Sequence, residues 1–153
     1  MSAKKWPPPG FPIVEGRHAI TDTWSIELPE RFARRVEDDS VVLWRPGLTI
    51  WLAAWGKDKT ESQAERLTSI KESAAPMRFE ECENNSDGIT RFSYRLRDEN
   101  EEGTVESIYA YVINDNGHLQ MAVYFDDPAE GVKARMLAES VSERDRRRTN
   151  HSS

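Results

Sequence analysis

Residues 105–125 read VESIYAYVINDNGHLQMAVYF, and this stretch gives the strongest evidence of the fold. Two runs rich in apolar residues lie on either side of Asn114-Asp115-Asn116-Gly117, a sequence that favours a tight turn. The stretch therefore predicts two strands, at 105–113 and 118–126. The link is too short for a parallel pair, which needs a long crossover, so the two strands form an antiparallel hairpin.

Further strands are predicted on the N-terminal side. Two of them are predicted at 78–83 and 90–97, and an acidic connection at 98–102 links the second to residue 105. A hairpin of 41–45 and 48–55 turns at Pro46-Gly47, where proline presets φ and glycine supplies a positive φ. Trp24 to Leu28 make a strand that Pro29 ends, and the charged residues 30–40 predict a loop or a single helical turn.

Two helices are predicted. The first spans 61–74, with Thr60 as N-cap, Gln63 at N3 and a stop at Pro76. Its apolar stripe consists of Ala64, Leu67, Ile70 and Ala74. The second helix begins at Asp127, with Pro128 in its first turn. It is expected to turn Val132, Met136 and Val141 toward the core, with Ala134, Leu137 and Ala138 beside them.

The predicted fold class is α+β, with a single antiparallel sheet of about six to seven strands packed against two main helices. A proline-rich N-terminal arm covers residues 1–16, the folded domain covers 17–142, and a disordered tail rich in Arg and Ser covers 143–153. Two arrangements of the arm are open: it lies along the domain, held there by Trp6, Phe11 and Ile13, or it is loose. No internal repeat and no second core is expected.

Three segments together resemble a known family. They are Trp24-Ser25-Ile26-Glu27-Leu28-Pro29, then Gly117-His118-Leu119-Gln120-Met121-Ala122-Val123-Tyr124, and finally the helix that closes on Glu139-Ser140-Val141. The layout of residues 18–142 resembles the PsbP-like fold of bacterial DcrB-type proteins and is similar to the adaptor chaperones of type VI secretion effectors. None of the matched residues is catalytic in those families. The resemblance implies an accessory, protein-binding role and a PsbP-like fold.

Composition narrows the classes of partner. The net charge is −6, so most of the surface repels phosphate backbones and nucleic-acid binding is not expected. No run approaches the roughly 20 apolar residues of a membrane span, so no membrane partner is expected either. Cys82 is the single cysteine, which is typical of a reducing compartment. With no apolar leader at the N-terminus, the chain is predicted to be cytoplasmic.

Reactive groups do not converge in the sequence. His18, His118 and His151 lie far apart, and no motif for a metal, a nucleotide or a nucleophilic serine occurs. Cys82 stands among glutamates and is predicted to be an inert thiol, and His118 a polar residue beside a turn. We therefore predict no catalytic residue, no cofactor and no metal. The protein is not expected to be an enzyme.

The most informative pattern is aromatic. Strands 48–55 and 105–113 are apolar on both faces, so each is either covered on both sides or exposes a binding patch. The predicted partner-binding residues on that second face are Trp51, Trp55, Tyr109, Tyr111 and Tyr124. The partner is predicted to be another protein bound by an adaptor or chaperone, or a second copy in a homodimeric structural module. A small ligand in a pocket between sheet and helix is the remaining alternative.

Overall fold

The computed structural model describes residues 6–56, 60–101 and 103–144, and in them nine strands form one antiparallel sheet. The strand order is β1-β2-β3-β4-β8-β7-β6-β5, and the short β9 pairs with β2. The strands are β1 (Ile13–Ala19), β2 (Trp24–Glu37), β3 (Ser40–Arg45), β4 (Leu48–Gly56), β5 (Phe79–Ser86), β6 (Ile89–Asn100), β7 (Gly103–Asn114), β8 (Gly117–Phe125) and β9 (Ser142–Glu143).

The predicted α+β class is wrong, although the single antiparallel sheet is present. Strands account for 58% of the structure, and the helices α1 (Gln63–Ser73) and α2 (Gly131–Ser140) are short. The predicted six to seven strands are also too few. Residues 13–16, assigned from the sequence to a proline-rich arm, begin β1, and the predicted tail contributes Glu143 to β9.

The charged residues after Pro29 cause the largest difference. The sequence predicts a loop or a single helical turn for them, but β2 continues through them to Glu37. Pro29 is tolerated because the pairing of β1 with β2 shifts there: Gly16 faces Leu28, whereas Val14 faces Phe32. A proline at such an irregularity removes no hydrogen bond from the ladder. Beyond it, Phe32 and Ala33 are fully buried, and this burial holds the charged segment in the sheet.

Both predicted hairpins form. Gly47 has φ 83° in the β3–β4 turn, as Pro46-Gly47 indicated. The β7–β8 turn contains Asp115 and Asn116, and the backbone N–H groups of Asn116 and Gly117 both donate to the side chain of Asn114. The expected acidic connection is shorter than predicted, because Asp98–Asn100 continue β6.

Helix α1 starts two residues later than predicted. Its N-cap is Ser62 rather than Thr60, and the N3 residue is Glu65 rather than Gln63. Ser62 Oγ accepts from Glu65 N at 3.1 Å, and Ser62 N donates to Glu65 Oε1 at 3.0 Å, which completes a capping box. Within α1, Leu67 and Ile70 are buried.

The predicted core side of helix α2 is only partly correct. Val132 and Met136 are 73% and 59% exposed, whereas Val141, Ala134, Leu137 and Ala138 are buried as predicted. The two alanines let the helix approach the sheet closely, and this packing outweighs the larger side chains on the other side. Asp127 caps the 3₁₀ turn Pro128–Glu130 before α2, accepting from Ala129 N at 3.0 Å.

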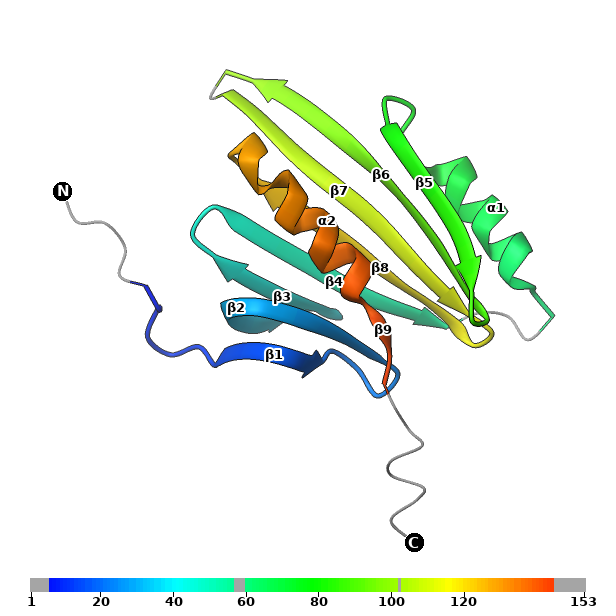
Figure 1. Ribbon diagram of the computed structural model, residues 1–153, viewed down its shortest axis with the longest axis horizontal. Helices are drawn as coiled ribbons and strands as arrows, with labels where there is room; N and C mark the ends of the chain where they lie inside the picture. Colours follow the sequence, from blue (N-terminus) through cyan, green and yellow to red (C-terminus); the bar gives the residue numbers. More distant parts are fainter. Residues whose placement is uncertain (1–5, 57–59, 102, 145–153) are drawn as a thin grey trace, which may run out of the picture.

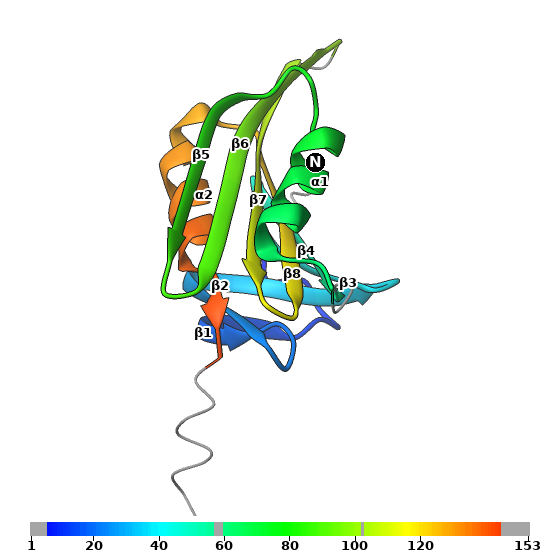
Figure 2. The ribbon, with the colours of Figure 1, turned by 90° about the vertical axis from the view of Figure 1, so that its right-hand side faces the viewer.

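The two helices lie on opposite faces of the sheet, as Figure 2 shows. Helix α2 packs across β2, β7 and β8 and closes the main core (Figure 1). Helix α1 packs on β6 and β7 from the other side, over a smaller cluster. The sheet is strongly twisted, so β2 and β3 run across the direction of β5 and β6 in Figure 2. We call the side of the sheet on which α1 packs the α1 face.

Candidate functional site

The register of the strands brings the five predicted partner-binding residues onto the α1 face. Trp55 lies opposite His118, and Trp51 opposite Ala122, in the pairing of β4 with β8. Ala122 in turn lies opposite Tyr109, and residues that pair directly project to the same side of a sheet. Trp51, Trp55, Tyr109, Tyr111 and Tyr124 therefore share one face, and they spread over three adjacent strands.

Helix α1 covers one part of this face. Leu67 and Ile70 pack on a cluster of side chains from β6 and β7. We call this cluster the covered half; it consists of Phe92, Tyr94, Tyr111 and Ile113. Tyr111 is only 9% exposed. Of the five predicted residues, Tyr111 is thus an interior residue that no partner can reach while α1 is in place.

Within the part of the chain that the structure describes, no helix lies over the rest of the face. We call it the open half; it consists of Trp44, Trp51, Trp55 and Tyr124, from β3, β4 and β8. Trp55 is 55% exposed, and the other three side chains are partly buried. Large apolar side chains with this exposure, gathered on one surface, are typical of interaction sites.

Small residues beneath the indoles shape the open half. Trp51 is flanked across the strands by Val42 on β3 and Ala122 on β8, both buried. Arg35 of β2 lies over the rings of Trp44 and Trp51, with its guanidinium carbon 4.9 and 5.6 Å from the ring centroids. Since a cation over an indole is attracted to its π face, Arg35 adds order to this surface.

The N-terminal segment touches the edge of the open half. The ring of Phe11 meets that of Trp44 edge-on, with 5.0 Å between the centroids. Arg34 N donates to the carbonyl of Pro12, and Ile13 begins β1. Phe11 is itself exposed, so the segment borders the open half without covering Trp55.

Two tyrosine hydroxyls mark the boundary between the halves. Tyr109 Oη and Tyr124 Oη lie 2.8 Å apart in a hydrogen bond. Burial raises the pKa of Tyr109, and this bond raises it further. Tyr109 is therefore neutral near neutral pH and cannot serve there as a general base.

His118 follows the exposed turn at Asp115 and Asn116, as predicted, but its side chain is buried next to the two halves. It is 5% exposed, with its ring 6.5 Å from that of Trp55 and 6.1 Å from that of Tyr111. Burial, and secondarily the charge of Arg66, lower the pKa of His118 to about 4. Nδ1 is buried and has no hydrogen-bond partner in the described residues.

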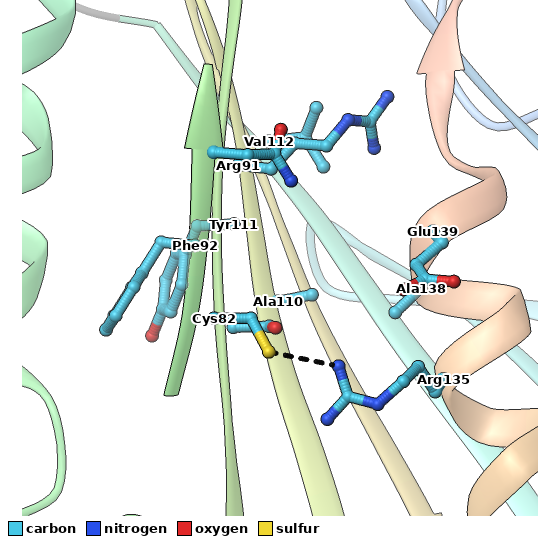
Figure 3. Close-up of a pocket in the computed structure, with 11 residues that line it drawn as sticks. Cys82, Arg91, Phe92, Ala110, Tyr111, Val112, Arg135, Ala138 and Glu139 are labelled. Atoms are coloured by element: carbon cyan, nitrogen blue, oxygen red, sulfur yellow. Dashed lines mark hydrogen bonds between the residues drawn. The ribbon is translucent and has the colours of Figure 1, made fainter. Parts of the chain in front are cut away.

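A small cavity lies between α2 and strands β5 and β6, on the other face of the sheet (Figure 3). Its volume is about 50 Å³, far below the roughly 300–1,000 Å³ of sites for drug-sized ligands. Arg135 points toward Cys82, with 3.6 Å between Nη1 and Sγ, while the guanidinium of Arg91 lies apart from them. The polar groups do not converge, so the cavity is poorly suited to a small-molecule site.

Metal-binding and membrane-spanning features were also sought. Within residues 6–56, 60–101 and 103–144, no three His, Cys, Asp or Glu side chains are grouped as metal ligands would be. His18 contacts Arg34, away from His118, and His151 lies outside the described residues. In the part of the chain that the structure describes, no helix has the length and apolarity that crossing a membrane requires.

The sequence interpretation missed three residues of this region. Trp44 alternates with Val42 and pairs with Thr49, so the hairpin register alone places it beside Trp51. Arg35 could not be found, because its segment was expected to be a loop. Arg66 projects from α1 and reaches the end of β4, a contact that no sequence pattern indicates.

Comparison with known proteins gives a fold and no function. No family model matches the chain, and no curated protein matches it. A crystal structure from Bacteroides thetaiotaomicron VPI-5482 superimposes with a TM-score of 0.65 at 10% sequence identity. The match covers 86% of this chain and 50% of that one, so this chain spans about half the length of its structural neighbour. At that identity the likeness shows a shared fold alone.

Proposed function

We propose that this protein is a non-enzymatic binding module, an adaptor or chaperone that holds a partner protein against the open half of the α1 face. The observation that carries the proposal is the exposure of Trp55, 55%, beside the half-buried Trp44 and Trp51. Tryptophan and tyrosine are enriched among the residues that dominate binding energy at protein interfaces. Tyr124 and Arg35 extend this surface with a hydroxyl and a guanidinium.

The expected partner presents an apolar or aromatic segment. The indoles of Trp51 and Trp55 offer area for such a segment, and the hydroxyl of Tyr124 offers a hydrogen bond at its edge. The resemblance of the chain's layout to PsbP-like and DcrB-type proteins favours the same accessory role. The proposal includes a cytoplasmic location, which the free, exposed thiol of Cys82 supports.

The test uses two surface positions of similar exposure on opposite sides of the sheet. Trp55 is 55% exposed on the α1 face, and Met136 is 59% exposed on α2. A photo-crosslinking residue is placed at one or the other position of the full chain. The protein is produced in cells, and the crosslinking residue is then activated by light. Position 55 is expected to give one defined crosslinked partner, and position 136 none.

The same pair serves as alanine variants once the partner is purified. Trp55→Ala is expected to weaken its affinity roughly 30-fold, the loss of a hot-spot residue of about 2 kcal/mol, and Met136→Ala to leave it unchanged. Equal crosslinking from both positions contradicts the proposal. A crosslink from position 55 to a second copy, with a dimer mass in light scattering, indicates the homodimeric module instead.

A further inference from the structure

Helix α1 is fixed to the sheet by few apolar contacts. Leu67 and Ile70 are its buried side chains, and Ala74 and Ala75 pack only partly. Burying a side chain of that size contributes about 1.5–3 kcal/mol, and ordering eleven helical residues opposes that gain. The docked position of α1 therefore depends on polar contacts as well.

Those polar contacts lie at the surface. Gln63 donates to the carbonyl of Gly88 at 2.8 Å and to Asp115 at 2.7 Å, and accepts from Thr90 at 2.8 Å. Lys71 pairs with Glu83. Hydrogen bonds of this kind add only about 0.5–1.5 kcal/mol each to stability, so separating α1 from the sheet is expected to cost less free energy than unfolding the sheet.

One contact brings a fixed positive charge to a buried histidine. Arg66 of α1 donates from Nη2 to the carbonyl of Gly56 at 2.9 Å and pairs with Glu61 at 2.9 Å. Gly56 pairs with Gly117, which precedes His118, so the guanidinium comes close to the imidazole. Arg66 Nε and His118 Nδ1 are both buried without a hydrogen-bond partner among the described residues.

Among the described residues, the groups that face His118 offer little compensation for a second positive charge. Trp55 of β4 and Tyr111 of β7 lie beside its ring, and both are uncharged near neutral pH. From α1 it faces Arg66, whose partner Glu61 is already engaged. Asp115, in the turn before β8, accepts from Gln63. A protonated His118 would thus be buried beside a like charge, which is costly.

We propose that α1 is an acid-sensitive cover of the sheet: protonation of His118 drives Arg66 and its helix away, and the covered half becomes exposed. Opening would add Tyr111, Phe92 and Ile113 to the exposed apolar surface beside Trp55. The inference does not rest on the proposed function, since opening is a property of the isolated protein.

The size of the effect follows from linkage. With a pKa near 4 when covered and 6.5 when exposed, lowering the pH from 7 to 5 favours the open form by up to roughly 20-fold. Amide hydrogen exchange of the full chain measures this opening, once each rate is corrected for the intrinsic pH dependence of exchange. The amides of α1 are expected to lose protection by that factor, while those of α2 and β4 keep theirs.

His118→Gln removes the titrating group and keeps a polar side chain of similar size. In that variant the protection of α1 is expected to be the same at pH 7 and pH 5. The proposal is overturned if wild-type α1 shows no change, or if His118→Gln retains the change, which would then belong to Glu61, Glu83 or Asp115.

Arg66→Gln provides a second test if His118→Gln folds poorly. Removing the positive charge is expected to raise the titration midpoint of His118 in NMR and to reduce the pH effect on α1. An unchanged midpoint and an undiminished pH effect in Arg66→Gln would contradict the mechanism.

Discussion

The covered half and the open half of the α1 face are both built from aromatic side chains at alternating positions of neighbouring strands. They differ in what lies above them. Leu67 and Ile70 of α1 pack on Tyr111, which is 9% exposed, whereas Trp55 on the open half is 55% exposed. The same residue types therefore serve as core in one place and as surface in the other. Residue identity alone does not separate these roles; the position of one short helix does.

The largest effect that distinguishes core in the covered half from surface in the open half is expected from truncating one aromatic residue of the covered half. Phe92 is 2% exposed and contacts the rings of Tyr94 and Tyr111. Phe92→Ala is expected to lower the free energy of unfolding by about 3–5 kcal/mol, because it leaves a cavity beneath α1. Urea denaturation followed by circular dichroism measures this. A loss below about 1 kcal/mol would mean that the covered half is not core.

A second test uses the pH dependence of stability. The pKa of His118 is lowered in the folded protein to about 4, against 6.5 when exposed, so the unfolded state binds the proton first as the pH falls. Stability is therefore unaffected above pH 6.5 and decreases as the pH falls toward 4. Between pH 7 and pH 5 the expected loss is about 2 kcal/mol.

Paired denaturation curves isolate the contribution of His118 from those of the carboxylates. Wild type and His118→Gln are compared at pH 7 and pH 5, and the difference between their pH effects is the quantity of interest. If both proteins lose the same stability between these pH values, His118 does not titrate as its burial implies.

The capping box of α1 allows a milder change that reaches only the covered half. Ser62→Ala removes the acceptor for Glu65 N and is expected to cost about 1 kcal/mol of helix stability. Exchange of α1 amides should increase, while affinity at the open half should remain as in wild type. Loss of affinity in Ser62→Ala would show that the two halves act together.

The strands of the sheet could be predicted from the sequence more fully than the packing of the two helices that cover it. The hairpins followed from Pro46-Gly47 and Asn114–Gly117, because turn residues dictate local backbone geometry. With register known, Trp51 and Tyr109 were placed on one face. The continuation of β2 was missed, since the burial of Phe32 and Ala33 depends on strands and a helix distant in sequence.

The helices were harder still. Both helices have polar and apolar residues on several sides. In α2 the spacing of apolar residues predicts that Val132 and Met136 face the core, although the structure exposes them. Which side of a short helix packs depends on how closely it can approach the sheet, and two alanines decided that for α2. The burial of Tyr111 has the same origin, because α1 lies over β7 rather than over β4.

The smallest expected effect on stability is that of Trp55→Ala. An exposed side chain at the end of β4 creates no cavity when truncated, and surface substitutions usually change the free energy of unfolding by less than about 0.5 kcal/mol. The same variant is expected to lose most of its affinity for the partner. Truncation at Trp55 therefore affects binding and hardly affects stability, whereas truncation at Phe92 lowers the stability itself. Thermal melting beside a binding titration measures both. If Trp55→Ala unfolds as readily as Phe92→Ala, then Trp55 belongs to the core and the open half is not a docking surface.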